Sequence, residues 1–235
     1  MTELLYQTDA YLKEFDAVVT ASFPDEKAVA LDRSAFYSGG GGQPNDIGKL
    51  AGANVVKVKK VGDDVLHFLD SNLPAVGTTV HGEVDWNRRY KLMRTHTAMH
   101  ILCGTVFRDY GALVTGGDME PLKGRMDFEF ERLQKELVSV IEAAVNVEVR
   151  ARRDVRVKIL PREEAFQIPD LIRTKINLLP EGIQQVRTVE IVGLDLQADG
   201  GTHVKNTSEV GFIRIVDYKS KGAANKRIYV EVQDS

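Results

Sequence analysis

The stretch from Trp86 to Tyr110 constrains the fold of this chain most, because its apolar pattern predicts one long amphipathic helix. Apolar side chains recur there at steps of three and four residues, which is the period of a single helix face. Asp85 before the stretch is a suitable N-cap, and Gly111 after it is a suitable C′ residue. We therefore predict a helix over residues 86–110 with one buried face, formed by Leu92, Met99, Cys103, Val106 and Tyr110.

Two histidines lie on this predicted buried face. His96 and His100 are four residues apart, so on a helix their rings stack one above the other. Both ring nitrogens can then reach one Zn²⁺ at about 2.0–2.1 Å. A lone histidine on an apolar face is more often a core residue, and the pair is no zincin motif, because Thr97 stands where HExxH has its glutamate.

A third histidine lies in the segment QADGGTH at residues 197–203. Asp199 and His203 have the spacing DxxxH, and the two glycines between them permit a tight backbone turn. Three histidines and one carboxylate make a candidate set of ligands for one zinc ion per chain.

The chain predicts an α+β protein of two domains, residues 1–85 and 86–235. Short runs rich in β-branched residues, separated by turn residues, indicate a small β-barrel-like domain in the first part. The second part reads as an α/β domain in which the long helix packs on an antiparallel sheet, with a further helix at 133–150. The strands expected are 17–23, 28–32, 55–61, 65–69, 79–84, 113–119, 125–130, 155–160, 186–193, 211–217 and 227–232.

The first domain contains a glycine-rich segment at residues 36–49, FYSGGGGQPNDIGK. A simple turn does not need four glycines, so we expect the backbone of this segment to come close to a bulky group. Gln43 would then be presented at the surface that faces this group. A flexible loop is the alternative, but Pro44 stiffens the segment. The segment is no dinucleotide-binding fingerprint, because it does not read as the start of a helix.

Composition places the chain among ordinary globular proteins, with 235 residues, 43% hydrophobic and 28% charged. No apolar run approaches the roughly 18 residues that span a bilayer, and the start has no leader pattern. We therefore expect a cytoplasmic protein without a membrane partner. Cys103 is the single cysteine, which excludes an intrachain disulfide, and we expect it to be a core residue far from the turn at residue 199.

The net charge of −3 argues against extensive coating of nucleic acid, and no DNA partner is expected. Local basic clusters still permit a specific contact with nucleic acid, although each is also typical of a solvated face. They comprise Arg88, Arg89, Lys91 and Arg94; Arg150, Arg152, Arg153, Arg156 and Lys158; and Lys219, Lys221, Lys226 and Arg227.

Four motifs in order, FYSGGGGQPNDIG, RTHTAMH, QADGGTHV and KGAANKRI, resemble the editing module of alanyl-tRNA synthetases and the free-standing AlaX-type editing proteins. Without a long C-terminal extension, the chain is similar to their medium-length class. The resemblance implies ATP-independent hydrolysis, in trans, of tRNA(Ala) mischarged with serine, or also with glycine, at a zinc site. The pocket in which a synthetase selects alanine rejects serine and glycine only weakly, because both are close to alanine in size. A separate editing pocket is therefore needed.

The resemblance assigns roles to individual residues. His96 and His100 match the family's HxxxH ligands, and His203 matches the histidine of its CxxxH, but Asp199 replaces the cysteine. Asp199 is then either a zinc ligand or a base that hydrogen-bonds zinc-bound water, and the sequence leaves both open. In either case zinc would activate water or anchor the aminoacyl group.

Other residues carry weaker assignments. Gln43 matches the family's glutamine and would hold substrate or water, with Gly40, Gly41 and Gly42 as the substrate loop. Thr115 is the candidate contact for the serine hydroxyl, although threonine is common in strands anyway. The residues expected to bind tRNA are Arg88, Arg89, Lys226 and Arg227.

Two other functions fit parts of the sequence. A catalytically silent tRNA-binding module would use a closed, structural zinc site. A peptide release factor would use Gly41, Gly42 and Gln43 as its GGQ, but that reading leaves the three histidines unexplained. The preference between serine and glycine, the recognition of the tRNA body, and the choice between monomer and homodimer stay open.

Overall fold

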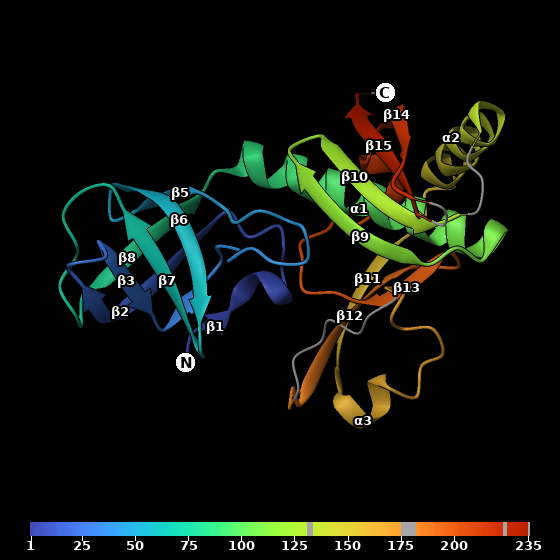
Figure 1. Ribbon diagram of the computed structural model, residues 1–235. Coiled ribbons are helices and arrows are strands. Elements are labelled where there is room, and N and C mark those ends of the chain that lie inside the picture. Colours follow the sequence, from blue (N-terminus) through green and yellow to red (C-terminus); the bar gives the residue numbers. More distant parts are fainter. Residues whose placement is uncertain (131–133, 175–181, 223–224, 235) are drawn as a thin grey trace. The chain divides into compact units, whose positions relative to one another are not determined.

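The computed structural model describes residues 1–130, 134–174, 182–222 and 225–234, and it shows a mixed α+β protein rich in strands (Figure 1). The predicted α+β class is confirmed. The chain forms two compact units, residues 1–91 and 92–235, whose boundary falls inside helix α1 (Trp86–Tyr110) rather than before it. No described helix is both long and apolar enough to cross a membrane. The predicted helix start at Leu133 and residues 223–224 of KGAANKRI lie outside the described residues.

The first unit is built from six strands that pair in the closed order β2-β3-β7-β6-β5-β8, with β8 returning to β2. Alternating side chains of these strands, among them Phe15, Leu31 and Leu50, point inward and form one apolar core with Phe36 from the loop before β5. The strands are β2 (Glu14–Phe23), β3 (Ala28–Leu31), β5 (Gly48–Leu50), β6 (Ala53–Val61), β7 (Asp64–Leu69) and β8 (Thr79–Val84); β1 (Glu3–Leu4) pairs with β4 (Arg33–Ser34), next to the 3-10 turn η1 (Leu5–Gln7).

The glycine-rich loop between β4 and β5 has a defined conformation that explains its composition. Gly39, Gly40, Gly41 and Gly42 have φ values of 84°, 136°, 56° and 86°. Residues with a Cβ rarely adopt positive φ, so four such positions in a row require glycine. This requirement disfavours the alternative of a merely flexible loop.

Helix α1 has the predicted bounds and caps. Asp85 accepts the N–H of Arg88 at 3.0 Å, and Gly111, with φ of 66°, donates to the carbonyl of Phe107 at 2.8 Å. The predicted inner face is buried except at its end, where Tyr110 is exposed and meets the edge of Phe130.

The second unit packs two antiparallel sheets and α1 together (Figure 1). On the larger sheet, Leu122 donates its N–H to Thr95 of α1 at 2.8 Å, and Gly124 leaves room for Met99. The larger sheet has the order β14-β15-β10-β9 and the smaller β11-β12-β13. The elements are β9 (Val114–Glu120), β10 (Lys123–Glu129), α2 (Lys135–Arg150), β11 (Val155–Pro161), α3 (Arg162–Ala165), β12 (Gln185–Ile191), β13 (Asp195–Ala198), η2 (Thr207–Glu209), β14 (Phe212–Ser220) and β15 (Asn225–Gln233).

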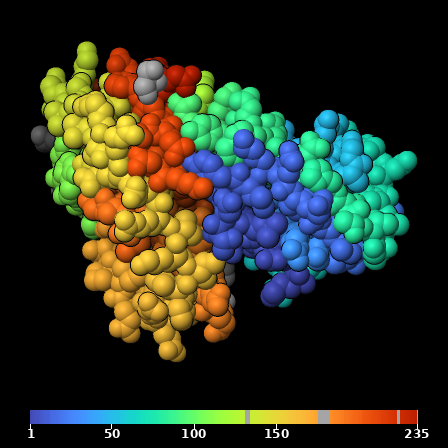
Figure 2. Space-filling model, turned by 180° about the vertical axis from the view of Figure 1, so that it is seen from behind, coloured from blue at the N-terminus to red at the C-terminus, as the bar shows by residue number. Residues whose placement is uncertain are grey.

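Strand β11 forms one edge of the smaller sheet, and most of its side chains are exposed. The yellow segment that contains β11 covers part of the face seen in Figure 2. Arg156 and Lys158 alternate along this edge, and charged side chains on an edge strand discourage pairing with another chain.

One buried group in the first unit makes stability depend on pH. His67 in β7 is fully buried and bonds to the Ser34 hydroxyl at 2.7 Å, and burial lowers its pKa from 6.5 to about 4. Between these values the unfolded chain binds the proton and the folded chain does not. We therefore expect the free energy of unfolding to fall by up to about 3 kcal/mol as the pH drops from 6.5 to 4.

The check is denaturant unfolding of wild type and His67→Gln across this pH range. Glutamine cannot titrate, so the variant should lose the part of the pH dependence that His67 supplies. Parallel profiles for the two proteins would contradict the expectation.

Candidate metal centre

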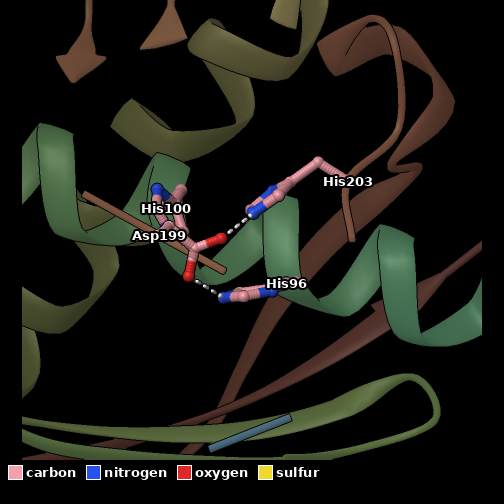
Figure 3. Close-up of side chains that lie close together, drawn as sticks. All are labelled: His96, His100, Asp199 and His203. Carbon is pink, nitrogen blue, oxygen red and sulfur yellow. Dashed lines mark hydrogen bonds and ion pairs between the residues drawn. The ribbon is translucent and has the colours of Figure 1, made fainter. Parts of the chain in front are cut away.

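The second unit brings together three histidines and one aspartate from distant parts of the chain. Helix α1 supplies His96 and His100, and the segment after β13 supplies Asp199 and His203. One ligand atom from each residue lies within 4.8 Å of the others, and the four could hold a metal ion (Figure 3). The four residues that the sequence singles out as ligands are therefore neighbours in the structure.

Asp199 lies between two of the imidazoles. Its Oδ2 is 2.9 Å from Nε2 of His203, and its Oδ1 is 3.6 Å from Nε2 of His96 (Figure 3). The turn after Asp199 is closed by its own carboxylate, which accepts the N–H of Gly201 at 2.9 Å. Neither Gly200 nor Gly201 has a positive φ, and a Cβ at Gly200 would meet no atom within 4 Å, so the predicted need for glycine in this turn is not confirmed at Gly200.

The Nδ1 atoms of His100 and His203 both have a partner behind the site. His100 donates from Nδ1 to Asp195 at 3.0 Å, which leaves its Nε2 as the nitrogen available to a ligand. His203 Nδ1 is 3.2 Å from the hydroxyl of Thr97, which can donate or accept and so supports either tautomer. Thr97 also accepts the N–H of Val204, the residue after His203, at 3.2 Å. Thr97, which stands where a zincin has its glutamate, therefore helps to orient His203.

Asp195 was not identified from the sequence as a site residue, and a glycine on α1 explains how it reaches His100. A Cβ at Gly104 would lie 2.9 Å from Cβ of Asp195, closer than real atoms approach. Glycine inside a helix costs about 1 kcal/mol relative to alanine, so it needs a packing reason, and here β13 is that reason. An isolated glycine one turn after His100 was the signal in the sequence.

The electrostatics of the site depend first on burial, which disfavours charged forms. Burial lowers the pKa of His96 well below its usual value and that of His203 to about 4, so both rings are neutral near pH 7. For His100, burial is outweighed by the hydrogen bond to Asp195, which raises its pKa. For Asp199, burial is outweighed by attraction to His96 and the hydrogen bond from His203, which hold its pKa well below its usual value.

This donor set has the chemistry that a zinc-type ion requires. Metal ligands must be neutral imidazole or ionised carboxylate, and the pKa directions at His96, His203 and Asp199 match that requirement. His100, whose pKa is raised, would have to release the proton on its Nε2 when a metal binds. Three imidazoles and one carboxylate suit zinc better than magnesium or calcium, which prefer oxygen ligands.

Cys103 lies nearer to the site than the sequence indicates. It is a buried core residue, as expected, but its sulfur accepts a hydrogen bond at 3.3 Å from Gln197, two residues before Asp199. Burial raises the pKa of the thiol strongly, so the free Cys103 thiol stays protonated, and Cys103 is not one of the four clustered residues.

The glycine-rich loop and Thr115 differ from their predicted environments. Gln43 is only 2% exposed, so it is not presented to solvent, whereas Gly40 and Gly41 are exposed. The hydroxyl of Thr115 donates to Asn225 at 2.6 Å, and Thr115 is not one of the four clustered residues. A contact with a serine hydroxyl would have to compete with this bond.

The expected tRNA-binding side chains are mostly engaged by the protein itself. Arg89 is fully buried in an ion pair with Asp46, which argues against the predicted contact with tRNA. Arg227 makes two bonds of 2.6 and 2.7 Å to Asp127, and Lys226, only 7% exposed, donates to the carbonyl of Gly222. The sequence alone does not show whether a basic side chain is exposed to solvent or already paired with an acidic side chain of the same protein.

Comparison with known proteins is consistent with this site. Residues 186–229 match the family described as the threonyl and alanyl tRNA synthetase second additional domain, and residues 3–88 match tRNA synthetases class II (A). The chain is 41% identical to the alanyl-tRNA editing protein AlaX-M of Saccharolobus solfataricus, covering 99% of this chain and 100% of that protein. It is 37% identical to AlaX-M of Methanosarcina barkeri over the full length of both. It is also 40% identical to the alanine–tRNA ligase of Ignicoccus hospitalis, covering 92% of this chain but 24% of the ligase.

Replacing Asp195 by asparagine should weaken metal binding without removing any ligand. Asparagine cannot hold the proton on Nδ1 of His100 as an ionised carboxylate does, and losses of this kind are typically about 10–100-fold in affinity. Calorimetric titration of metal-free protein with Zn²⁺ measures the effect. His203→Ala, which removes one of the four candidate ligands, should show the larger loss, and wild-type affinity in Asp195→Asn would contradict the role given to Asp195.

Proposed function

The chain belongs to the AlaX-M family of alanyl-tRNA editing proteins, and we propose that it hydrolyses the aminoacyl ester of mischarged tRNA(Ala) in trans. The observation that carries this proposal is the cluster of His96, His100, Asp199 and His203, in a chain whose similarity to these editing proteins extends over its full length. The glycine-rich β domain would correspond to the first unit and the editing domain to the second.

We propose Ser-tRNA(Ala) as the main substrate and Gly-tRNA(Ala) as a second one. A pocket that hydrogen-bonds a hydroxyl rejects the analogue without it by a large factor, so serine can be separated sharply from alanine. Glycine offers no group of its own for such a contact, and we expect it to be the weaker substrate. Gln43, Thr115 and the loop at Gly40, Gly41 and Gly42 are the residues proposed to hold the aminoacyl end.

We propose zinc as the resident metal, held by His96, His100 and His203 with Asp199 as fourth ligand or as base. When bound, zinc polarises carbonyl oxygens and lowers the pKa of water. Asp199 would be ionised at neutral pH, because its pKa is held low, and so it can ligate a cation or accept a proton from water. The guanidinium of Arg187 donates to the backbone carbonyl oxygen of Asp199 at 2.9 Å and so helps to fix the position of this residue.

For tRNA binding we retain Arg88, Lys226 and Arg227 and leave out the buried Arg89. Phosphate contacts release counterions, so such binding should weaken steeply with salt. At Arg227 a phosphate would have to compete with Asp127, which already holds the guanidinium with two hydrogen bonds.

The direct test is deacylation of Ser-, Gly- and Ala-tRNA(Ala) by the purified protein. We expect rapid release of serine, slower release of glycine and little release of alanine, and loss of activity in His100→Ala. Equal rates on all three substrates, or full activity in His100→Ala, would refute the proposed editing function. Activity only in the presence of ribosomes would instead favour a release factor.

The role of Asp199 can be tested by comparing Asp199→Asn with Asp199→Cys. If Asp199 is a zinc ligand, cysteine should keep the metal, because thiolate is also a good ligand, and asparagine should lose it in part. If it is a base, asparagine should retain zinc but lower deacylation by about 10²–10⁴. Zinc content and Ser-tRNA(Ala) deacylation are measured side by side, and wild-type values of both in Asp199→Asn would exclude either role.

A further inference from the structure

An ion pair between Arg89 and Asp46 is buried within the first unit, with side chains 0% and 1% exposed. Nε of Arg89 donates to both carboxylate oxygens of Asp46, at 3.0 and 2.9 Å, and a second guanidinium nitrogen also contacts the carboxylate. Taking two charges out of water is costly, so a pair of this kind persists only where further hydrogen bonds satisfy both groups.

Those further bonds tie the two ends of the glycine-rich loop to one side chain. The guanidinium of Arg89 donates to the carbonyl of Ala35 at 2.5 Å and to that of Ala10 at 3.0 Å. Ala35 directly precedes the segment 36–45 and Asp46 directly follows it. A single arginine therefore holds both ends of the loop.

From Asp46 the hydrogen bonds continue into the loop itself. Asp46 accepts the N–H of Tyr37 at 2.6 Å and returns its own N–H to the carbonyl of Tyr37 at 3.0 Å. The hydroxyl of Tyr37 donates to the carbonyl of Gly40 at 2.9 Å. Gly40 and Gln43 then exchange two backbone hydrogen bonds of 3.0 and 2.9 Å. Each step between Arg89 and Gln43 is a short, directional contact.

We propose that Arg89 and Asp46 are positioning residues that fix the conformation of the glycine-rich loop and thereby set how efficiently the protein acts on mischarged tRNA. This inference rests on the proposed function, in which the loop holds the aminoacyl end. It gives Arg89 a role different from phosphate binding. Lysine could not replace Arg89, because a point charge cannot reach Asp46, Ala35 and Ala10 together.

The experiment compares Arg89→Lys and Asp46→Asn with the surface variant Arg33→Gln as a matched control. Arg33 belongs to the same unit but pairs at the surface, with Glu3 and Asp32. For each protein we would measure hydrogen exchange at the amides of Tyr37, Gln43 and Asp46, zinc content, and kcat and KM for Ser-tRNA(Ala).

We expect exchange at the three loop amides to be at least about tenfold faster in Arg89→Lys, because the loop loses its hold at both ends. The value of kcat/KM should fall by about tenfold or more while zinc content stays at the wild-type level. Asp46→Asn should fall between Arg89→Lys and wild type, since its amide oxygen can still accept the N–H of Tyr37. Arg33→Gln should match wild type in every measurement.

Other outcomes would overturn the inference in distinct ways. Fast loop exchange with wild-type kinetics would show that the conformation of the loop does not matter for the reaction. Wild-type exchange in both variants would show that the pair does not hold the loop. Unfolding of the whole first unit in both would assign the pair to the fold and not to the loop. Failure of wild type to deacylate any tRNA would refute the proposed function alone, and the exchange data would still decide whether the pair fixes the loop.

Discussion

The second unit depends on keeping the carboxylate of Asp199 ionised where little water reaches it. Burial opposes that charge, and His96, His203 and the N–H of Gly201 compensate for it. Because these partners come from α1 and from the segment after β13, the same contacts that hold the charge also join distant parts of the chain. The site is therefore part of what holds the second unit together.

Much of the fold could be predicted from periodicity and turn residues. The bounds of α1 agree because a long amphipathic pattern, an aspartate N-cap and a glycine C′ residue all indicate the same helix. Strand β13 could not be predicted in this way. The strand has only four residues, Asp195 to Ala198, and none of them is β-branched. It forms because it pairs with β12.

The site was predictable in part, for a related reason. His96 and His100 follow from helical spacing, and the DxxxH spacing in the segment QADGGTH adds Asp199 and His203. The bond between His100 and Asp195 joins residues 95 positions apart, and its local trace in the sequence is Gly104, which does not identify the partner. The burial of Arg89 was missed for the same reason, because its partners at Asp46, Ala35 and Ala10 lie far away in sequence.

The run of four glycines with positive φ has a consequence for the handedness of the backbone. Positive φ is the region that D-amino acids favour, by mirror symmetry with the region that L-amino acids favour. The φ values of Gly39 to Gly42 therefore lie in the mirror image of the region that an L-configured chain usually adopts. Single residues with a Cβ also have positive φ in this chain, Ala51 and Leu122 among them, but glycine is the one genetically encoded residue that adopts it in four consecutive positions without strain. A chemically synthesised loop with D-alanine at these positions would match this backbone geometry, where L-alanine would strain it.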